Sequence, residues 1–211
     1  MKLDLKNNMV VITPSRGRPE NIESLLQAFK DTNTKADLCV VVDLDDERLP
    51  EYQKIDGVEY LMSFAREGKG MAKPLNKAAA ILLDSYRHLA FLGDDHRPRT
   101  EGWDSLMIQA LDEMGCGLVY GNDLIQGERL ATAVAMTRNI VVELDGMVPK
   151  NLQHLYLDNF WMKLGQDIGG LKYLGHVVIE HMHPLAGKAA WDAGYQEVNA
   201  GEMYEADSKA Y

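Results

Sequence analysis

The first half of the chain alternates short apolar runs with segments in which apolar residues recur every three or four positions. Continuous apolar runs are typical of buried parallel strands, because both faces of such strands are covered; they lie at 9–12, 38–42 and 89–92. The helical spacing predicts one helix from about residue 21 and another over 73–87, while 57–64 fits an edge strand. This succession predicts a parallel sheet with right-handed crossovers.

The second half of the chain is less regular. Helices are predicted over 104–114 and 152–164, and strands at 117–120, 131–136 and 177–180. The strand at 131–136 is expected to be partly exposed, and 141–145 fits either a helix or a strand. The polar segment after residue 187 predicts a helix that frays toward its end. With 211 residues and no low-complexity linker, we expect one α/β domain at 1–187 and a C-terminal tail at 188–211.

The composition is that of a globular protein without a membrane span. The hydrophobic content of 46% and the charged content of 26% are ordinary. No apolar run approaches the roughly 20 residues that cross a bilayer, and charges interrupt the N-terminal segment where a secretory signal needs an apolar core. The two cysteines, Cys39 and Cys116, are expected to be reduced thiols in a cytoplasmic protein. A net charge of −10 argues against bulk electrostatic binding to nucleic acid but leaves a local basic groove open.

The apolar run at 89–92 ends abruptly in Gly93, Asp94, Asp95 and His96. Open α/β sheets bind ligands at the carboxyl ends of their strands. Adjacent carboxylates repel one another and are costly to bury unless a cation or proton lies between them. The three polar residues therefore predict a divalent metal ion that holds an anionic substrate. The alternative is an acidic turn that caps the following helix.

Other strand ends carry polar groups suited to a nucleotide. Strand one ends in a loop with Pro14, Ser15, Arg16 and Arg18, and strand two ends in Asp43 and Asp45. A Gly-Lys-Gly turn at 68–70 opens the next helix, and helix N-termini and lysines both bind phosphate. The turn supplies Lys69, and the helix that it opens supplies Lys73 and Asn76. Each feature alone is weak, because loop arginines and such turns are usually solvated, but together they predict a nucleoside-diphosphate site.

A short motif near the end of the expected domain places His181 and His183 two residues apart. In an extended segment, residues two apart share a face, so both imidazoles can bind one ion. The alternative is a structural or surface pair of histidines. A closed structural zinc site is not expected, because the cysteines are not paired at a suitable spacing.

The order of these motifs resembles the GT-A-fold glycosyltransferases, especially family 2 and its small phage-encoded members. The resemblance spans about 10–183 and rests on the strand-one loop, on the segments 42–46 and 68–76, and on 91–96 followed by Gly102-Trp103-Asp104. It implies a mixed, mainly parallel sheet flanked by helices, with a nucleotide-sugar-binding half up to about residue 100 and an acceptor half at 101–187. It also implies that the strand-one loop and Asp43 bind the base and ribose of a sugar nucleotide, by default a UDP-sugar. An Asp-x-Asp motif would hold Mn²⁺ or Mg²⁺ against the diphosphate.

The chain departs from the Asp-x-Asp pattern because Gly93 stands where the first aspartate is expected. This leaves Asp95 as the metal ligand, with Asp94 beside the ribose or a metal-bound water. Alternatively, Asp94, Asp95 and His96 form the triplet and His96 replaces the last carboxylate. GT-A enzymes often complete the metal site with a C-terminal histidine, for which the resemblance implies His183 first and His181 second.

Asp158 stands roughly where family 2 members carry an acidic pair at a helix start, which implies the general base of an inverting reaction. Asn159 replaces the second acid, so retention stays open. Asp158 is also suited to cap the helix. Lys69 or Lys73 would stabilise the charge of the departing diphosphate. Trp103 and Trp161 offer a platform for a sugar, although such aromatic residues more often pack in a core.

We therefore expect a metal-dependent glycosyltransferase that moves a hexosyl or pentosyl group from a nucleoside-diphosphate sugar to an acceptor hydroxyl. The acceptor is open among a modified DNA base, a virion protein and a glycan, and the setting would be the cytoplasm, that of a host cell for a phage protein. One alternative is a magnesium-dependent phosphatase of the haloacid-dehalogenase type, because Asp43 and Asp45 imitate its first motif, although Glu47 stands where Thr or Val is expected. The other is a non-catalytic sugar-nucleotide-binding protein, because the first metal aspartate is missing.

Overall fold

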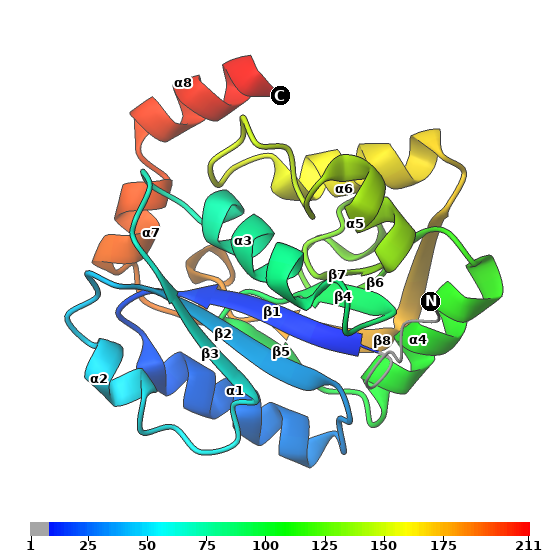
Figure 1. Ribbon diagram of the computed structural model, residues 1–211, viewed down its shortest axis with the longest axis horizontal. Helices are drawn as coiled ribbons and strands as arrows, with labels where there is room; N and C mark the ends of the chain where they lie inside the picture. The colour runs from blue at the N-terminus through cyan, green and yellow to red at the C-terminus, as the bar shows by residue number, and fades with distance from the viewer. Residues whose placement is uncertain (1–8) are drawn as a thin grey trace.

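An eight-stranded mixed sheet runs through the centre of the protein (Figure 1). The computed structural model describes residues 9–211, and the charged N-terminal segment 1–8 lies outside the described residues. β1 to β4 are parallel neighbours, β6 is parallel to β8, and the remaining pairings are antiparallel. In spatial order the strands are β3 (Tyr60–Phe64), β2 (Asp37–Asp43), β1 (Met9–Ser15), β4 (His88–Phe91), β7 (Val134–Thr137), β6 (Leu118–Asn122), β8 (Leu171–His181) and β5 (His96–Pro98).

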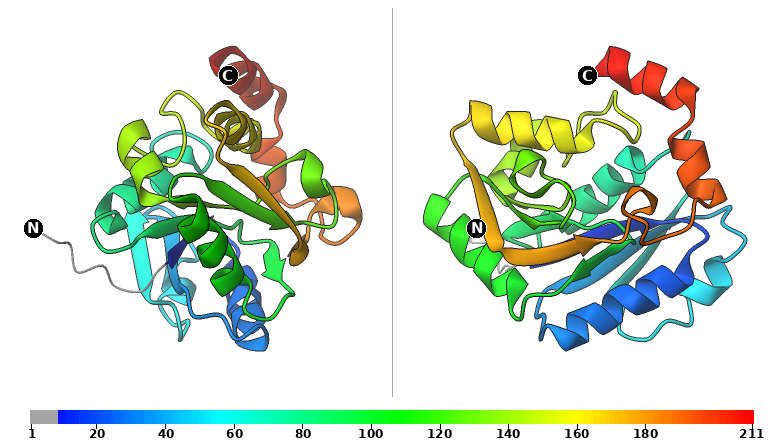
Figure 2. Two further views of the ribbon diagram at one scale, coloured as in Figure 1. Left: turned by 90° about the vertical axis from the view of Figure 1, so that its right-hand side faces the viewer. Right: turned by 180° about the vertical axis from the view of Figure 1, so that it is seen from behind.

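Helices cover both faces of this sheet, which confirms the predicted α/β architecture (Figures 1 and 2). α3, α5 and α6 pack on one face, and α1 and α4 pack on the other. α7 and α8 follow the last long strand and lie beyond the carboxyl end of β1 (Figure 1). The helices are α1 (Pro19–Asp31), α2 (Leu49–Tyr52), α3 (Ala72–Leu82), α4 (Trp103–Met114), α5 (Arg138–Leu144), α6 (Leu157–Asp167), α7 (Ala193–Val198) and α8 (Gly201–Ala210).

The apolar runs of the central strands are continuous because both faces of the sheet are buried. Successive side chains of a strand point to opposite faces. In β1, Val10 and Ile12 therefore pack with α3, whereas Met9 and Val11 pack with α1. The same burial on both faces explains why β2 and β4 were recognisable in the sequence as unbroken apolar segments.

The carboxyl ends of β1, β2 and β4 meet at one edge of the sheet, where the functional residues gather. Ser15 at the end of β1 lies beside Val42 near the end of β2, and β4 ends at Phe91 beside Ile12. The long strand β8 reaches the same edge by pairing first with β6 and then with β5, where His181 lies opposite His96. The fold therefore joins a segment from residue 181 to the loops of the first hundred residues.

The structure differs from the sequence-based expectations at several elements of the second half. The helix expected over 152–164 begins only at Leu157, because the backbone N–H groups of 153–155 bind the carboxylate of Asp207 instead of helical carbonyls. The strand expected at 177–180 is the end of the longer β8, and the ambiguous segment 141–145 lies mostly in helix α5. β7 is buried rather than partly exposed, because it lies between β4 and β6.

Three further differences concern short or terminal elements. The helix expected over 73–87 ends at Leu82, after which the chain turns, with the N–H of Ser85 bonded to the Leu82 carbonyl. β5 and α2 are too short to produce a periodic pattern and were not predicted. The C-terminal segment does not fray early, because α7 and α8 bury Tyr195, Met203 and Asp207. No helix among residues 9–211 combines the length and apolar character needed to cross a membrane.

Candidate functional site

A cleft of about 430 Å³ opens at the edge where β1, β2 and β4 end. The strand ends form one wall, the segment 154–159 forms a second, and α7 with the start of α8 closes a third. Most of the residues predicted from the sequence line this cleft. They are Pro14, Ser15, Arg16, Arg18, Asp43, Asp94, Asp95, Asp158, His181 and His183.

Four predicted residues lie outside the cleft wall. Asp45 is 56% exposed and acts on the site only through Arg16, whose guanidinium it meets at 2.7 Å. Lys69 is exposed, and the Nζ of Lys73 lies 3.9 Å from Glu67. Asn76 instead holds the loop after α5, because it accepts the N–H groups of 147 and 148 and donates to the carbonyl of 148. Of the Gly-Lys-Gly turn itself, Gly70 lines the cleft, so the phosphate-binding role expected of this turn stays a prediction.

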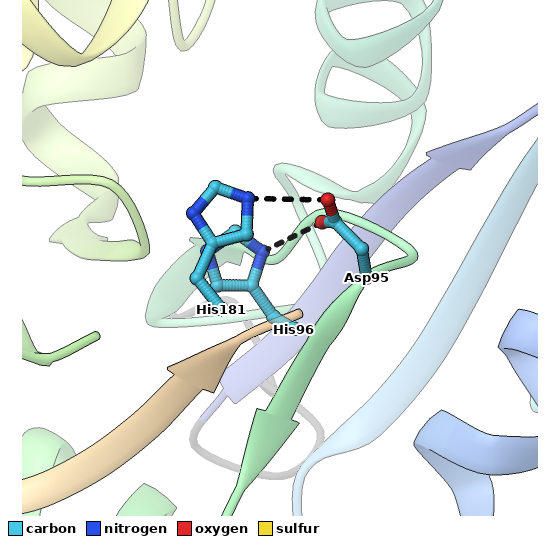
Figure 3. Close-up of side chains that lie close together, drawn as sticks. All are labelled: Asp95, His96 and His181. Carbon is cyan, nitrogen blue, oxygen red and sulfur yellow. Dashed lines mark hydrogen bonds and ion pairs between the residues drawn. The ribbon is translucent and has the colours of Figure 1, made fainter. Parts of the chain in front are cut away.

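Asp95, His96 and His181 form a compact cluster at the floor of the cleft (Figure 3). His181 Nε2 donates to Asp95 Oδ2 at 3.1 Å, and His96 Nδ1 lies 3.4 Å from Asp95 Oδ1. The two imidazole rings stack, with 4.2 Å between their centroids. One possible ligand atom from each residue lies within 4.8 Å of the others, which is close enough to surround one ion.

The charges of this cluster depend on one another. Burial opposes ionisation of Asp95, but its contacts with His181 and His96 outweigh burial and hold the pKa of Asp95 well below its usual value. Burial lowers the pKa of His181, yet the hydrogen bond to Asp95 prevails and leaves that pKa raised. The pKa of His96 is lowered by burial and by the neighbouring His181. The cluster therefore contains an ionised carboxylate and one imidazole that stays neutral.

The residues of the cluster fit a divalent metal ion. His96 Nδ1 accepts the N–H of Gly93 at 3.0 Å, and its Nε2 is buried without a hydrogen-bond partner among the described residues. A buried polar atom without a partner is costly unless a ligand satisfies it. One carboxylate and two imidazoles form a donor set of mixed oxygen and nitrogen, which suits Mn²⁺ better than Mg²⁺, a cation that prefers oxygen ligands.

Gly93 lies against the side chains of this cluster. A Cβ atom there would lie 2.6 Å from Asp95 Oδ1 and 2.8 Å from His96 Nδ1, closer than real Cβ contacts. An aspartate at 93 therefore does not fit without moving the other two residues. The alternative in which His96 replaces a carboxylate of the Asp-x-Asp motif matches this geometry.

His183 lies beside the cluster rather than in it. Its Nδ1 accepts the N–H of Leu185 at 3.2 Å, and its ring meets that of His181 edge to face with 5.0 Å between centroids. It also contacts the rings of Trp191 and Tyr195. His183 also lines the cleft, so it is placed to contact a ligand beside the three clustered residues.

Asp94 is buried directly beside the metal cluster and joins it to the strand-one loop. Its Oδ2 accepts the Ser15 hydroxyl at 2.7 Å, and its Oδ1 lies 3.4 Å from Arg18 Nη1. Burial and the neighbouring charge of Asp95 raise the pKa of Asp94 to about 6. The position suits a carboxylate that accepts hydrogen bonds from a bound polar ligand.

Arginines from two strand ends surround Asp43. Arg16 donates to Asp43 at 3.0 Å, and Nε of Arg66 lies 3.7 Å from the same oxygen. Burial raises the pKa of Asp43 despite both cations. Arg66 follows β3 and was not singled out in the sequence, although its place after a strand was the available signal. These residues form one wall of the cleft, on which carboxylate oxygens and guanidinium groups lie together.

Asp158 lines the cleft from the first turn of α6. Tyr156 occupies the N-cap position of that helix, so Asp158 is not its capping residue. Burial raises the pKa of Asp158, which makes its carboxylate a stronger base than that of an exposed aspartate. Trp103 and Trp161 are completely buried in the core and offer no sugar platform.

Helix α7 and the residue before it contact the cleft residues Asp95, Arg18 and Arg66. The Tyr195 hydroxyl donates to Asp95 Oδ2 at 2.6 Å. Arg18 binds Asp192 through two hydrogen bonds and stacks on the Tyr195 ring, and Arg66 binds Glu197 at 2.7 Å. No local sequence pattern indicates these contacts, because the partners are 100 residues or more apart along the chain.

The mixed α/β sheet with its cleft at the strand ends is the GT-A-like fold of nucleotide-sugar transferases. One similar solved structure is TarS from S. aureus, with a TM-score of 0.64 and 14% identity over 82% of this chain. This chain covers only 36% of the length of TarS. The sequence matches no family model and no curated protein.

Two other solved structures share the fold. Glucosyl-3-phosphoglycerate synthase from Mycobacterium tuberculosis, solved with Mn²⁺, uridine diphosphate and phosphoglyceric acid, has a TM-score of 0.62 and 14% identity. The match covers 86% of this chain and 74% of that one. A putative nucleotide-diphospho-sugar transferase from Desulfovibrio desulfuricans has a TM-score of 0.54 and 11% identity, with 94% of both chains covered. At these identities the likeness shows the fold alone.

Proposed function

We propose that the protein is a metal-dependent glycosyltransferase that moves a sugar from a nucleoside-diphosphate sugar to an acceptor hydroxyl. The observation that carries this proposal is that three kinds of chemical group line one cleft. Its donor wall holds Asp43 with Arg16 and Arg66, and its floor holds the cluster formed by Asp95, His96 and His181. The segment 154–159 adds Asp158. The motif order supports placing the chain with family 2 and its small phage-encoded members.

The donor wall is suited to a nucleoside diphosphate. Asp43 can accept hydrogen bonds from a base or ribose, while Arg16, Arg18 and Arg66 carry the charge that a diphosphate needs. In the structure Arg18 binds Asp192 and Arg66 binds Glu197. A bound diphosphate would replace these two carboxylates as the partner of the arginines. UDP is proposed as the nucleotide, and the likeness to a synthase solved with UDP supports it.

Asp95, His96 and His181 would hold Mn²⁺ or Mg²⁺, and their nitrogen content favours Mn²⁺. When bound, this ion neutralises the negative charge that develops on a departing diphosphate. The likeness to a synthase solved with Mn²⁺ supports the same choice. The arginines of the donor wall supply the rest of the positive field around the leaving group.

The proposed reaction is a direct displacement with inversion. The acceptor oxygen forms a bond to the anomeric carbon while the bond from that carbon to the diphosphate oxygen breaks, and the diphosphate leaves with the electron pair. The acceptor proton passes to the Asp158 carboxylate. Burial of Asp158 makes it a stronger base than an exposed aspartate, and it lines the same cleft as the donor wall.

The phosphatase alternative gains no support from the geometry. Its nucleophile would be Asp43 with Asp45 as acid, but both carboxylates are bound to Arg16. A nucleophile held by a guanidinium loses reactivity, because its charge is already engaged. The non-catalytic alternative rests on the missing first aspartate, and the cluster of Asp95, His96 and His181, whose ligand atoms lie close enough to hold one ion, speaks against it.

Thermal unfolding tests the proposal directly. The protein is heated with UDP, GDP, CMP, dTDP and ADP, each with and without Mn²⁺. A ligand at about a hundred times its dissociation constant adds roughly 2.7 kcal/mol to the free energy of unfolding. We expect one nucleotide to raise the melting temperature, and only with the metal present. The Asp95→Asn variant should lose the metal-dependent part of the shift, and the absence of any shift in the wild-type protein would refute the donor site.

A further inference from the structure

The C-terminal helix α8 is fastened to the wall of the cleft that carries Asp158. Asp207 is fully buried and accepts three successive backbone N–H groups from the segment 153–155, at 2.9, 2.9 and 2.7 Å. Tyr211 stacks on Tyr156 with 5.4 Å between ring centroids, and Asn151 donates to the carbonyl of 210. Figure 1 shows α8 beside this loop. The helix therefore determines the shape of the segment that leads into α6.

This segment is held from its other side by the Gly-Lys-Gly turn. The Ala72 N–H donates to the Gln153 carbonyl at 2.9 Å. A Cβ on Gly70 would lie 2.4 Å from that carbonyl oxygen, so only glycine permits the approach. The segment 153–156 is thus fixed between the turn and Asp207. It also contains Tyr156 at φ +63°, a left-handed conformation that is costly for a bulky residue and is retained when the surroundings enforce it.

The surface presented to the cleft by this wall combines aromatic rings with uncharged polar atoms. Tyr156 lines it, and Tyr204 lines the cleft from α8 beside it and remains 48% exposed. The Nδ1 of His154 is buried without a partner among the described residues, and burial lowers the pKa of His154 to about 4, so the imidazole is neutral. Asn159 adds an amide. Aromatic faces and neutral hydrogen-bonding groups suit a ring that carries hydroxyl groups.

The charges of the cleft disfavour a polyanion at this wall. The lysine and arginine side chains among its described lining residues are Arg16, Arg18 and Arg66, all on the donor side. Each is bound to a carboxylate and is required there for a diphosphate. The wall itself carries the carboxylate of Asp158, and the chain has a net charge of −10. A nucleic-acid strand would bring phosphates without a cation to receive them.

We propose that α8 builds the acceptor subsite, that a neutral carbohydrate ring packs there against Tyr156 and Tyr204, and that Asp207 is the residue that positions this wall. The inference rests on the proposed function, because an acceptor is needed only by a transferase. It assigns to the segment 188–211 a part in acceptor binding, and it selects a glycan from the open set of acceptors.

The experiment measures transfer from radiolabelled UDP-sugars with Mn²⁺ to two kinds of acceptor. One kind is a panel of methyl glycosides of neutral hexoses, and the other is a single-stranded oligonucleotide containing 5-hydroxymethylcytosine. Hydrolysis of the donor by water is followed in parallel. We expect transfer to at least one glycoside and none to the oligonucleotide. Transfer to the oligonucleotide alone, or donor hydrolysis without transfer to any glycoside, would overturn the carbohydrate assignment.

Variants of α8 then test the residues. Tyr204→Ala should raise the KM for the glycoside about tenfold while the KM for the donor changes little, and Tyr204→Phe should restore acceptor binding because it keeps the ring. Asp207→Asn should show the same split between acceptor and donor KM. Lys209→Ala, an exposed change on the same helix, is the matched control.

Two outcomes distinguish a failure of the proposed acceptor subsite from a failure of the proposed function. An unchanged glycoside KM in Tyr204→Ala overturns the subsite even if Asp207→Asn fails to fold, because Tyr204 is exposed enough to be replaced without loss of the fold. If the wild-type protein neither binds a nucleotide nor hydrolyses a donor, the proposed function itself is refuted.

Discussion

Replacing Gly70 by alanine probes the contact between the Gly-Lys-Gly turn and the wall that carries His154. Gly70 has φ +90°, and its added Cβ would lie 2.4 Å from the Gln153 carbonyl oxygen and 2.7 Å from the His154 Cβ. Gly68 offers a matched control, because its φ is +89° but its added Cβ would meet nothing closer than 3.9 Å. Both substitutions carry the cost of an unfavourable backbone angle, but only Gly70→Ala adds a steric clash with the 153–154 segment.

The magnitudes follow from these distances. An alanine at positive φ costs about 1–2 kcal/mol, which both variants lose. Gly70→Ala must also push the 153–154 backbone away, which breaks the hydrogen bond from the Ala72 N–H, worth about 1 kcal/mol, and leaves the neighbouring groups strained. We expect Gly68→Ala to lower the free energy of unfolding by about 1–2 kcal/mol and Gly70→Ala by about 3 kcal/mol or more.

Equilibrium unfolding in urea measures both variants under one condition. The difference between them, rather than either value, tests the packing, because the backbone cost cancels. At about 2–4 °C per kcal/mol for a chain of this size, the same difference is visible in melting temperatures. Equal destabilisation by the two substitutions would refute the close approach of the turn to the wall, and with it the account of how that wall is fixed.

Three further variants address the chemistry. Asp158→Asn should keep nucleotide binding in the unfolding assay while turnover falls about a hundredfold or more, as expected for a lost general base; an equal loss of both would indicate a structural residue. Tyr195→Phe should tighten Mn²⁺ binding by about tenfold in a calorimetric titration, because a metal ion at Asp95 competes with the Tyr195 hydroxyl. The magnitude follows because a hydrogen bond to a charged group is worth about 1.5–3 kcal/mol. An unchanged affinity would mean that this hydrogen bond persists beside the metal. His154→Gln should reduce the loss of stability on acidification: burial lowers the pKa of His154 to about 4, so the unfolded chain binds the extra proton and the wild-type protein loses stability as pH falls from about 6.5 toward 4. Parallel stability curves for the wild type and this variant would contradict the buried neutral imidazole.

The donor side of the cleft could be predicted because its signals are local. Each of β1, β2 and β4 is an unbroken apolar run, and in a parallel sheet the residues that follow such runs meet at one edge. This rule alone brings Arg16, Asp43 and Asp95 together, and the cleft lining agrees with it. The rule does not say which way a loop side chain points. Lys69 and Lys73 follow a phosphate-like turn in sequence but lie outside the cleft lining.

The other walls depend on contacts that no local pattern contains. Asp207 reaches back more than fifty residues to hold the segment 153–155, and Tyr195 reaches Asp95 across 100 residues. Neither residue stands in a strong periodic segment or beside a recognisable motif. The carboxylate of Asp207 also removes the first turn of the expected helix, which is why the sequence placed that helix five residues too early. At this segment the backbone N–H groups bind a carboxylate that is distant in the sequence, although the spacing of the apolar residues predicts a helix.

Gly93 shows how a departure from a family pattern can carry information that the sequence alone misreads. Read as a missing aspartate, it weakened the expectation of a metal site and supported a non-catalytic protein. In the folded chain, the space of a Cβ at 93 is taken by Asp95 Oδ1 and His96 Nδ1, and the N–H of 93 fixes the His96 ring. An aspartate at this position would displace the cluster rather than complete it. The glycine therefore leaves room for the His96 imidazole in the site, and β8 provides the second imidazole by pairing His181 with His96.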